Sequence, residues 1–235
     1  MKNHFNGIKK GFTLAEVLIT LGIIAVVAAI TLPTLVANYQ KKQTVVRLKE
    51  AYTLLNQAIK NAELKEGDIE TWDFGSKHFD FSEAQNFVER YLAPQFNVAK
   101  KCYDSDCVIT TKYTLSKRVY ASYLETDKYR GRSLFLTNGM QLWAYSDSDE
   151  PLKKIGIVVD LNGDGRPNTV GRDIFFFEIR NNSSQVIMPG LGRNRSNLLS
   201  DNVDGCNTTA VNVAGWYCGA LIQYDGWEIK DDYPW

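Results

Sequence analysis

Histidine is nearly absent from this chain. Two histidines occur in 235 residues, and His4 precedes a long apolar segment, which leaves His78 as the one histidine beyond it. Histidine is the commonest general acid–base group near neutral pH and a frequent zinc ligand. The sequence also has no G-x-S-x-G and no H-E-x-x-H motif. The composition therefore argues against a histidine-based hydrolase and against a zinc enzyme.

A net charge is also lacking, because 27 basic and 27 acidic residues cancel. Residues 1–11 carry three lysines and no acid, so the remainder has 24 basic and 27 acidic residues, a charge of about −3. No basic stripe of the kind that binds nucleic acid is visible. We therefore expect no nucleic-acid partner.

Residues 12–37 form an apolar run in which Glu16 is the single charged side chain. As a helix, these 26 residues would extend roughly 39 Å, enough to cross a hydrocarbon core of about 30 Å. The run is too long for the apolar part of an ordinary cleaved signal, which is about 7–15 residues. Lysines on its short side predict a single-pass protein with its amino terminus in the cytoplasm.

Helical spacing of apolar residues continues over 38–66 and ends near Gly67, which predicts one long helix with an amphipathic second half. Gly22 and Pro33 interrupt its first half. Proline cannot donate to the carbonyl four residues earlier, so a kink is expected at Pro33. The alternative is that glycine and proline are simply commoner in membrane helices.

Residues 9–16 read Lys-Lys-Gly-Phe-Thr-Leu-Ala-Glu. This stretch resembles the signal of type IV prepilins and type II secretion pseudopilins (G-F-T-L-x-E). The resemblance implies that a prepilin peptidase cuts between Gly11 and Phe12, that the new amine is methylated, and that Glu16 pairs with the Phe12 ammonium of a neighbouring subunit. It also implies that the helix can loosen around its glycine and proline during packing. Ala15 departs from the family, which usually has a larger aliphatic residue there, and an alternative for Glu16 is an interfacial side chain that reaches headgroup water.

Beyond the long helix, residues 67–235 predict an exported α+β domain with an antiparallel sheet, after a leader over 1–11 and helix halves over 12–37 and 38–66. Ser82 and Gln85 suggest a capping box that starts a short helix ending before Pro94. Asn138-Gly139 predicts a type I′ hairpin turn. Period-two patterns predict strands at 109–115, 119–124, 134–137, 140–145, 155–159, 174–179 and 185–188. The tail predicts a turn at 225–226 and a last strand with Trp227 inward.

Four cysteines in an exported chain predict two disulfides with three possible connectivities. Cys102 and Cys107 have neither metal-site nor redox CxxC spacing, and no histidine lies near them. Cys206 and Cys218 enclose 11 residues. The resemblance to pilin-like proteins, which often close a carboxyl-terminal loop in this way, favours the pairs 102–107 and 206–218.

One polar loop is a candidate metal site. Asp160, Asn162 and Asp164 fall at the first, third and fifth positions of a calcium-loop pattern with glycine sixth, and Asn168 and Asp173 could add oxygen ligands. The twelfth position, normally glutamate, is glycine. The alternative is a strand-connecting turn with its carboxylates in water. The loop is therefore a candidate site for a structural calcium, and no other cofactor is expected.

Three functions follow from these patterns. The first is a structural pilin or pseudopilin subunit, anchored in the bacterial inner membrane, with homologous subunits and the peptidase–methyltransferase as partners. The second is a membrane-tethered or filament-tip module that binds a ligand or adheres. The third, an exported hydrolase that works with two carboxylates, has no motif in its favour. Secretion, DNA uptake, motility and adhesion machines share the same amino-terminal signal, so the sequence does not choose among them.

Overall fold

A computed structural model describes residues 11–77, 80–102, 111–120, 133–147 and 152–235. The chain divides into two compact units at residues 41 and 42, and each is described by itself. His78 and the strand residues predicted at 109–110 and 121–124 lie outside the described residues.

Helix α1 (Leu14–Glu66) begins in the first unit and continues without a break through Gly22 and Pro33. Nearly every side chain from residue 11 to residue 41 is exposed. The hydroxyls of three threonines donate to carbonyls of their own helix at 2.9 Å (Thr20 to Val17, Thr31 to Val27, Thr34 to Thr31). Polar groups satisfied inside the helix are compatible with hydrocarbon. Among the described helices, α1 has the length and apolar composition needed to cross a membrane.

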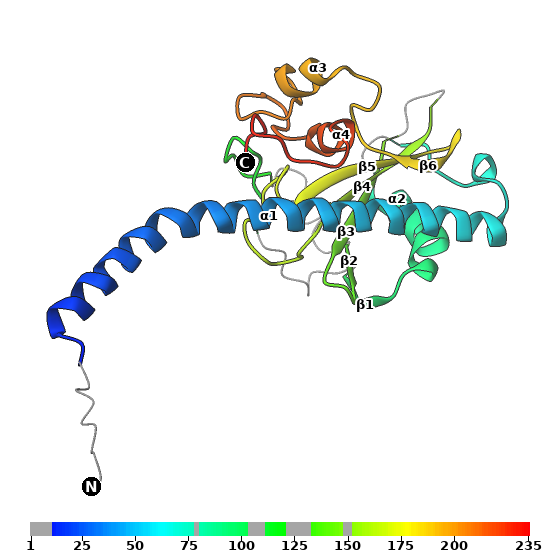
Figure 1. Cartoon of the computed structure of the whole chain (residues 1–235). Helices are drawn as coiled ribbons and strands as arrows, with labels where there is room; N and C mark the ends of the chain where they lie inside the picture. The colour runs from blue at the N-terminus through cyan, green and yellow to red at the C-terminus, as the bar shows by residue number, and fades with distance from the viewer. Residues whose placement is uncertain (1–10, 78–79, 103–110, 121–132, 148–151) are drawn as a thin grey trace, which may run out of the picture. The chain divides into compact units, whose positions relative to one another are not determined.

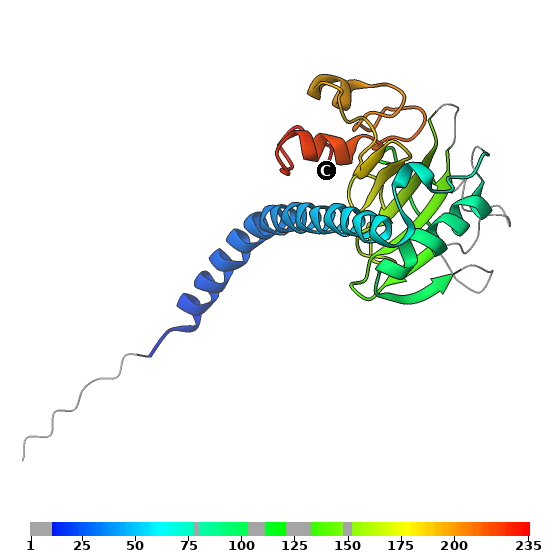
Figure 2. The same cartoon turned by 90° about the vertical axis from the view of Figure 1, so that its right-hand side faces the viewer.

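In the second unit, the remainder of α1 lies across one face of a β-sheet (Figures 1 and 2). The predicted apolar stripe is confirmed, since six of its members are buried: Leu48, Ala51, Leu55, Ala58, Ile59 and Ala62. Polar residues of α1 also form hydrogen bonds with the turns between strands. The Arg47 guanidinium donates to the carbonyls of Leu161 at 2.7 Å and Asn138 at 2.8 Å, and Asn138 donates to Glu50 at 2.8 Å.

The sheet has six antiparallel strands in sequence order, so each strand pairs with the next one in the chain. They are β1 (Val98–Cys102), β2 (Ser133–Leu136), β3 (Gln141–Ser146), β4 (Lys154–Asp160), β5 (Ile174–Arg180) and β6 (Ser183–Ile187). The α+β prediction is confirmed, and β2 to β6 lie within two residues of their predicted positions. Strand β1 was not predicted. Tyr113 and Val119, expected in two longer strands, make an isolated bridge.

The register of β3, β4 and β5 separates two faces. Leu142, Val159 and Phe175 are opposite one another and share the core with α1. Their neighbours Trp143, Val158 and Phe176 point to the other side, which we call the outer face. Part of the chain over 112–120 and 213–216 covers the outer face, with Tyr120 edge-on to Phe176 at 5.7 Å and Trp216 stacked on Phe176 at 3.9 Å.

A helical layer joins α1 to β1: η1 (Ile69–Thr71), α2 (Phe81–Phe87), a π-helical turn η2 (Val88–Leu92) and η3 (Ala93–Gln95). The predicted short helix is confirmed, but its cap is different. The Asp80 carboxylate accepts from the amides of Ser82 at 2.8 Å and Glu83 at 3.0 Å, so Asp80, rather than Ser82, is the N-cap of the helix.

The carboxyl-terminal region contains α3 (Arg195–Ser200) and α4 (Cys218–Tyr224), packed against each other. The turn at Asp225 and Gly226 is confirmed by a φ of 77° at Gly226. The predicted last strand is wrong, because the residues after this turn have no regular structure. The Arg195 side chain holds this tail instead. Its guanidinium nitrogens donate to the carboxylate oxygens of Asp225 at 2.7 and 2.9 Å and to those of Asp232 at 2.7 Å.

Candidate functional site

The first candidate site is the amino-terminal end of α1, where Thr13 and Glu16 cap the helix reciprocally. The Thr13 amide and hydroxyl each donate to Oε2 of Glu16 at 2.8 Å, and the Glu16 amide donates to the Thr13 hydroxyl at 3.2 Å. This is a capping box of the T-x-x-E type, which satisfies amides that the first helical turn leaves without partners.

Glu16 therefore has a structural task in its own chain. Its Oε1 accepts no hydrogen bond from any described residue, so one carboxylate oxygen is available beyond the cap. Sequence reasoning considered Glu16 as an assembly residue or an interfacial side chain and missed the cap, although the T-x-x-E spacing was the available signal. A Cβ added at Gly11 or Gly22 would meet no atom within 4 Å, so neither glycine is required by packing within one chain.

The second candidate site is the β4–β5 loop together with Asp160 at the end of β4, a stretch that contains the five predicted calcium ligands. The structure brings two of them, Asp160 and Asn168, to one point, which is occupied by the ammonium of Lys112. Lys112 Nζ contacts Asp160 Oδ2 and donates to Asn168 Oδ1 at 2.8 Å and to the Gly163 carbonyl at 3.0 Å. The side chains of Lys112 and Asp160 are both 0% exposed.

The other predicted ligands accept no hydrogen bond from the Lys112 ammonium, although the Asn162 backbone amide donates to Asp160 Oδ1 at 3.2 Å. Asp173 accepts from the amides of Asn168 at 2.7 Å and Thr169 at 2.6 Å, while Asn162 and Asp164 are exposed. Burial raises the pKa of Asp160 to about 7, against the opposing effect of Lys112. Within the described ranges, no three histidine, cysteine or acidic side chains gather as metal ligands.

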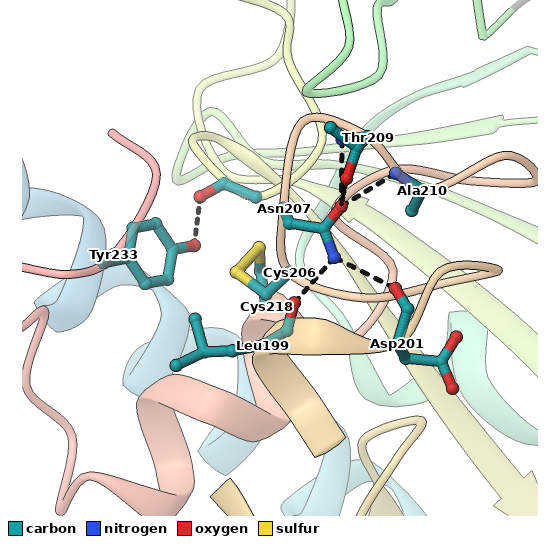
Figure 3. Close-up of a disulfide and its surroundings, with 9 residues drawn as sticks. Leu199, Asp201, Cys206, Asn207, Thr209, Ala210, Cys218 and Tyr233 are labelled. Carbon is teal, nitrogen blue, oxygen red and sulfur yellow. Dashed lines mark hydrogen bonds between the residues drawn. A yellow bond between two sulfur atoms is a disulfide. The ribbon is translucent and has the colours of Figure 1, made fainter. Parts of the chain in front are cut away.

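The disulfide between Cys206 and Cys218 is present as predicted, with the two Cα atoms 4.6 Å apart (Figure 3). Asn207 shapes the loop that the bond closes. Its amide nitrogen donates to the carbonyls of Leu199 and Asp201 at 2.6 and 2.9 Å, and its oxygen accepts from Thr209 and Ala210. Cys102 is also disulfide-bonded, and Cys107, its expected partner, lies outside the described residues.

Gly171, in the β4–β5 loop, packs closely against this disulfide. Its φ is 80°, and a Cβ added there would lie 2.7 Å from Cys218 Sγ. The buried Tyr233 hydroxyl donates to the Gly171 carbonyl, so the end of the chain is fastened at the same place. A residue with a side chain would therefore be strained here and would also collide with the disulfide.

A cavity of about 450 Å³ opens on the outer face. Aromatic residues line it together with charged ones that pair with each other. Lys154 lies 2.7 Å from Asp147 and 3.7 Å from Glu178, and Arg180 lies 2.6 Å from Glu178. The aromatic lining is Tyr120, Trp143, Tyr145, Trp216 and Tyr217. Such a combination can hold a ligand that offers both a flat apolar face and hydrogen-bonding groups.

Comparison with known proteins gives two family matches. Residues 8–32 match the prokaryotic N-terminal methylation motif. The chain therefore carries a prepilin-type signal and is of the pilin-like class, which implies processing by a prepilin peptidase and assembly with other pilin subunits. The signal and the apolar helix are consistent with anchoring in the inner membrane. No curated protein and no solved structure matches the chain.

The second match covers most of the chain and takes in the whole globular unit. The family model that matches residues 34–235 is described as a family of unknown function (DUF6613). Because that model covers more than half of the chain, this protein belongs to the DUF6613 family and carries a prepilin-type methylation motif ahead of the matched region.

Proposed function

We propose that this protein is a structural subunit of a type IV pilus or of a type II secretion filament. The observation that carries the proposal is the methylation motif at residues 8–32, followed by a helix whose side chains up to residue 41 are nearly all exposed. Exposed apolar side chains over this length need either lipid or neighbouring subunits to cover them. In a filament subunit, lipid covers these side chains before assembly and neighbouring subunits cover them afterwards.

In this proposal, the lysines before Gly11 hold the amino terminus at the cytoplasmic side, and the globular unit is exported. The peptidase then removes residues 1–11 and leaves a free ammonium on Phe12, which is methylated. Gly22 and Pro33 are weak points of α1 at which the helix loosens when subunits pack. This role for them would draw on the conformational freedom of glycine and on the hydrogen bond that proline cannot make.

The capping box gives Glu16 two tasks in the same proposal. One oxygen, Oε2, stabilises the first turn of α1, and in this proposal Oε1 accepts from the Phe12 ammonium of a neighbouring subunit. An ion pair of this kind is strong in a low-dielectric surrounding, where an unpaired carboxylate is costly. The ion pair would also set the axial register between neighbouring subunits, because it forms when the two helices have the correct axial offset.

Processing provides the first test. We expect the protein recovered from membranes to begin at Phe12 with one added methyl group, and Gly11→Val to remain uncut because its side chain obstructs the peptidase. Intact mass and amino-terminal sequencing measure both. Gly22→Val is the matched control, since it also replaces an exposed glycine of the same segment, and it should be cut normally. An uncut wild-type chain would contradict the proposal.

The cavity on the outer face favours a second candidate, a filament-tip module that binds a neutral saccharide. Its aromatic lining could stack on a sugar ring, and its paired charges could bond hydroxyls without attracting a charged ligand. A panel of neutral oligosaccharides should then contain one that raises the melting temperature of the full chain. Arg193→Ala, which changes a partly exposed residue of the cavity rim, should abolish that rise. Absence of any shift across the panel would count against this candidate.

A further inference from the structure

Lys112 is buried in an unusual setting, because its ammonium has no contact with solvent. The side chain is 0% exposed, as is the side chain of Asp160, with which it forms an ion pair. An ammonium has three N–H donors. The structure gives it three acceptors, which are a carboxylate, a carbonyl and a side-chain amide oxygen, from Asp160, Gly163 and Asn168. Every donor of the buried charge can therefore be satisfied.

The same three oxygen types are those that a protein offers to Ca²⁺. They come from one loop, at positions one, four and nine counted from Asp160, and this loop is the one whose sequence matches the front half of a calcium loop. The lysine comes from outside the loop, 48 residues earlier in the chain. An ammonium and a divalent cation cannot share these oxygens, because their like charges would repel at short range in a poorly screened interior.

We infer that Lys112 is a built-in cation that occupies the place of a calcium ion, so that the β4–β5 loop closes without a metal. The calcium-like sequence pattern and the absence of glutamate at its twelfth position then have a common explanation. The loop keeps the oxygens that face inward, and the exposed Asn162 and Asp164 are not needed as ligands.

Backbone hydrogen bonds hold Lys112 beside the β4–β5 loop. The Tyr113 amide donates to the Asn168 carbonyl, and the Val170 amide donates to the Tyr113 carbonyl, both at 2.8 Å. The Tyr120 amide donates to the Lys112 carbonyl at 2.8 Å, which closes the hairpin that covers the outer face. Lys112 thus ties this hairpin to the β4–β5 loop, a task that a free ion could not perform.

The test compares the full chain, purified in detergent, with two variants at one position. The melting temperature of the wild type should be the same with millimolar Ca²⁺ as with a chelator. Lys112→Ala removes the ammonium and leaves room for an ion, so it should melt roughly 10 °C lower with chelator and regain part of that loss with Ca²⁺. Lys112→Met also removes the charge but fills the space, so it should melt lower with no response to Ca²⁺.

Two results would overturn the inference. One is stoichiometric binding of Ca²⁺ to the wild type by calorimetry, which can be measured whether or not the variants fold. The other is a Lys112→Ala chain that Ca²⁺ does not stabilise, since its oxygens would then be no cation site. If Lys112→Ala does not fold in chelator, refolding with Ca²⁺ decides instead, because recovery supports the inference and failure to recover overturns it.

Discussion

Glu16→Gln is expected to be cut and methylated normally but to be incorporated into filaments about tenfold less than the wild type, or worse. The amide oxygen of glutamine can still accept from Thr13 and complete the cap, as glutamine does in many capping boxes. The substitution removes the charge that would pair with a neighbouring Phe12 ammonium. The measurement is the fraction of the chain found in sheared filaments relative to the membrane, together with its amino-terminal sequence.

Two other variants separate the cap from the charge. Thr13→Val keeps the carboxylate but removes the hydroxyl that contacts Glu16 at 2.8 Å, so its incorporation should fall less than that of Glu16→Gln. Glu16→Val removes both interactions and should be the most impaired, with cleavage unchanged. Normal incorporation of Glu16→Gln would refute the ion pair while leaving the cap intact.

The second large effect is expected from the disulfide between Cys206 and Cys218. Replacing both cysteines by alanine should lower the free energy of unfolding by about 3 kcal/mol, because the bond removes loop-closure entropy from the unfolded chain. Both cysteines are fully buried, and the bond lies beside α4, whose first residue is Cys218. Denaturant unfolding of the full chain in detergent measures the loss as a shift of the midpoint.

Single substitutions provide the control for the missing bond. Cys206→Ala leaves a buried free thiol at 218, and it should lose about as much stability as the double variant if the cross-link itself is responsible. Asn207→Ala is expected to lose less, since it keeps the bond and removes the hydrogen bonds that shape the loop. An unchanged midpoint for the double variant would show that packing, and not the bond, holds this region.

Periodicity predicted the parts of the fold that bury one face. The stripe of α1 and strands β2 to β6 follow from spacings of three to four and of two residues. Between β2 and β3 the hairpin is confirmed, but its turn type is wrong. Asn138 does not have the positive φ that a type I′ turn requires, and Gly139 alone has one, at 85°.

The elements that sequence reasoning missed lack such a signal. Strand β1 carries Lys100 and Lys101 on the exposed edge of the sheet, where lysines discourage pairing with another chain and hide the strand pattern. The apolar run 218–224 is too short for its period to separate helix from strand, so α4 was not predicted. Lys112 could not be placed with Asp160, because nothing local indicates a contact across 48 residues.

Gly171 limits how the calcium-like pattern of this loop can be completed. It holds the twelfth position of the calcium-like pattern, where a complete EF-hand loop has a bidentate glutamate. Its left-handed backbone and the nearness of Cys218 Sγ make Gly171→Glu costly unless the disulfide moves too. Tyr233 is bonded to the same carbonyl, so the tail would have to shift as well. A glutamate ligand at position 171 would therefore require changes at the disulfide and in the tail, whatever residue stands at position 112.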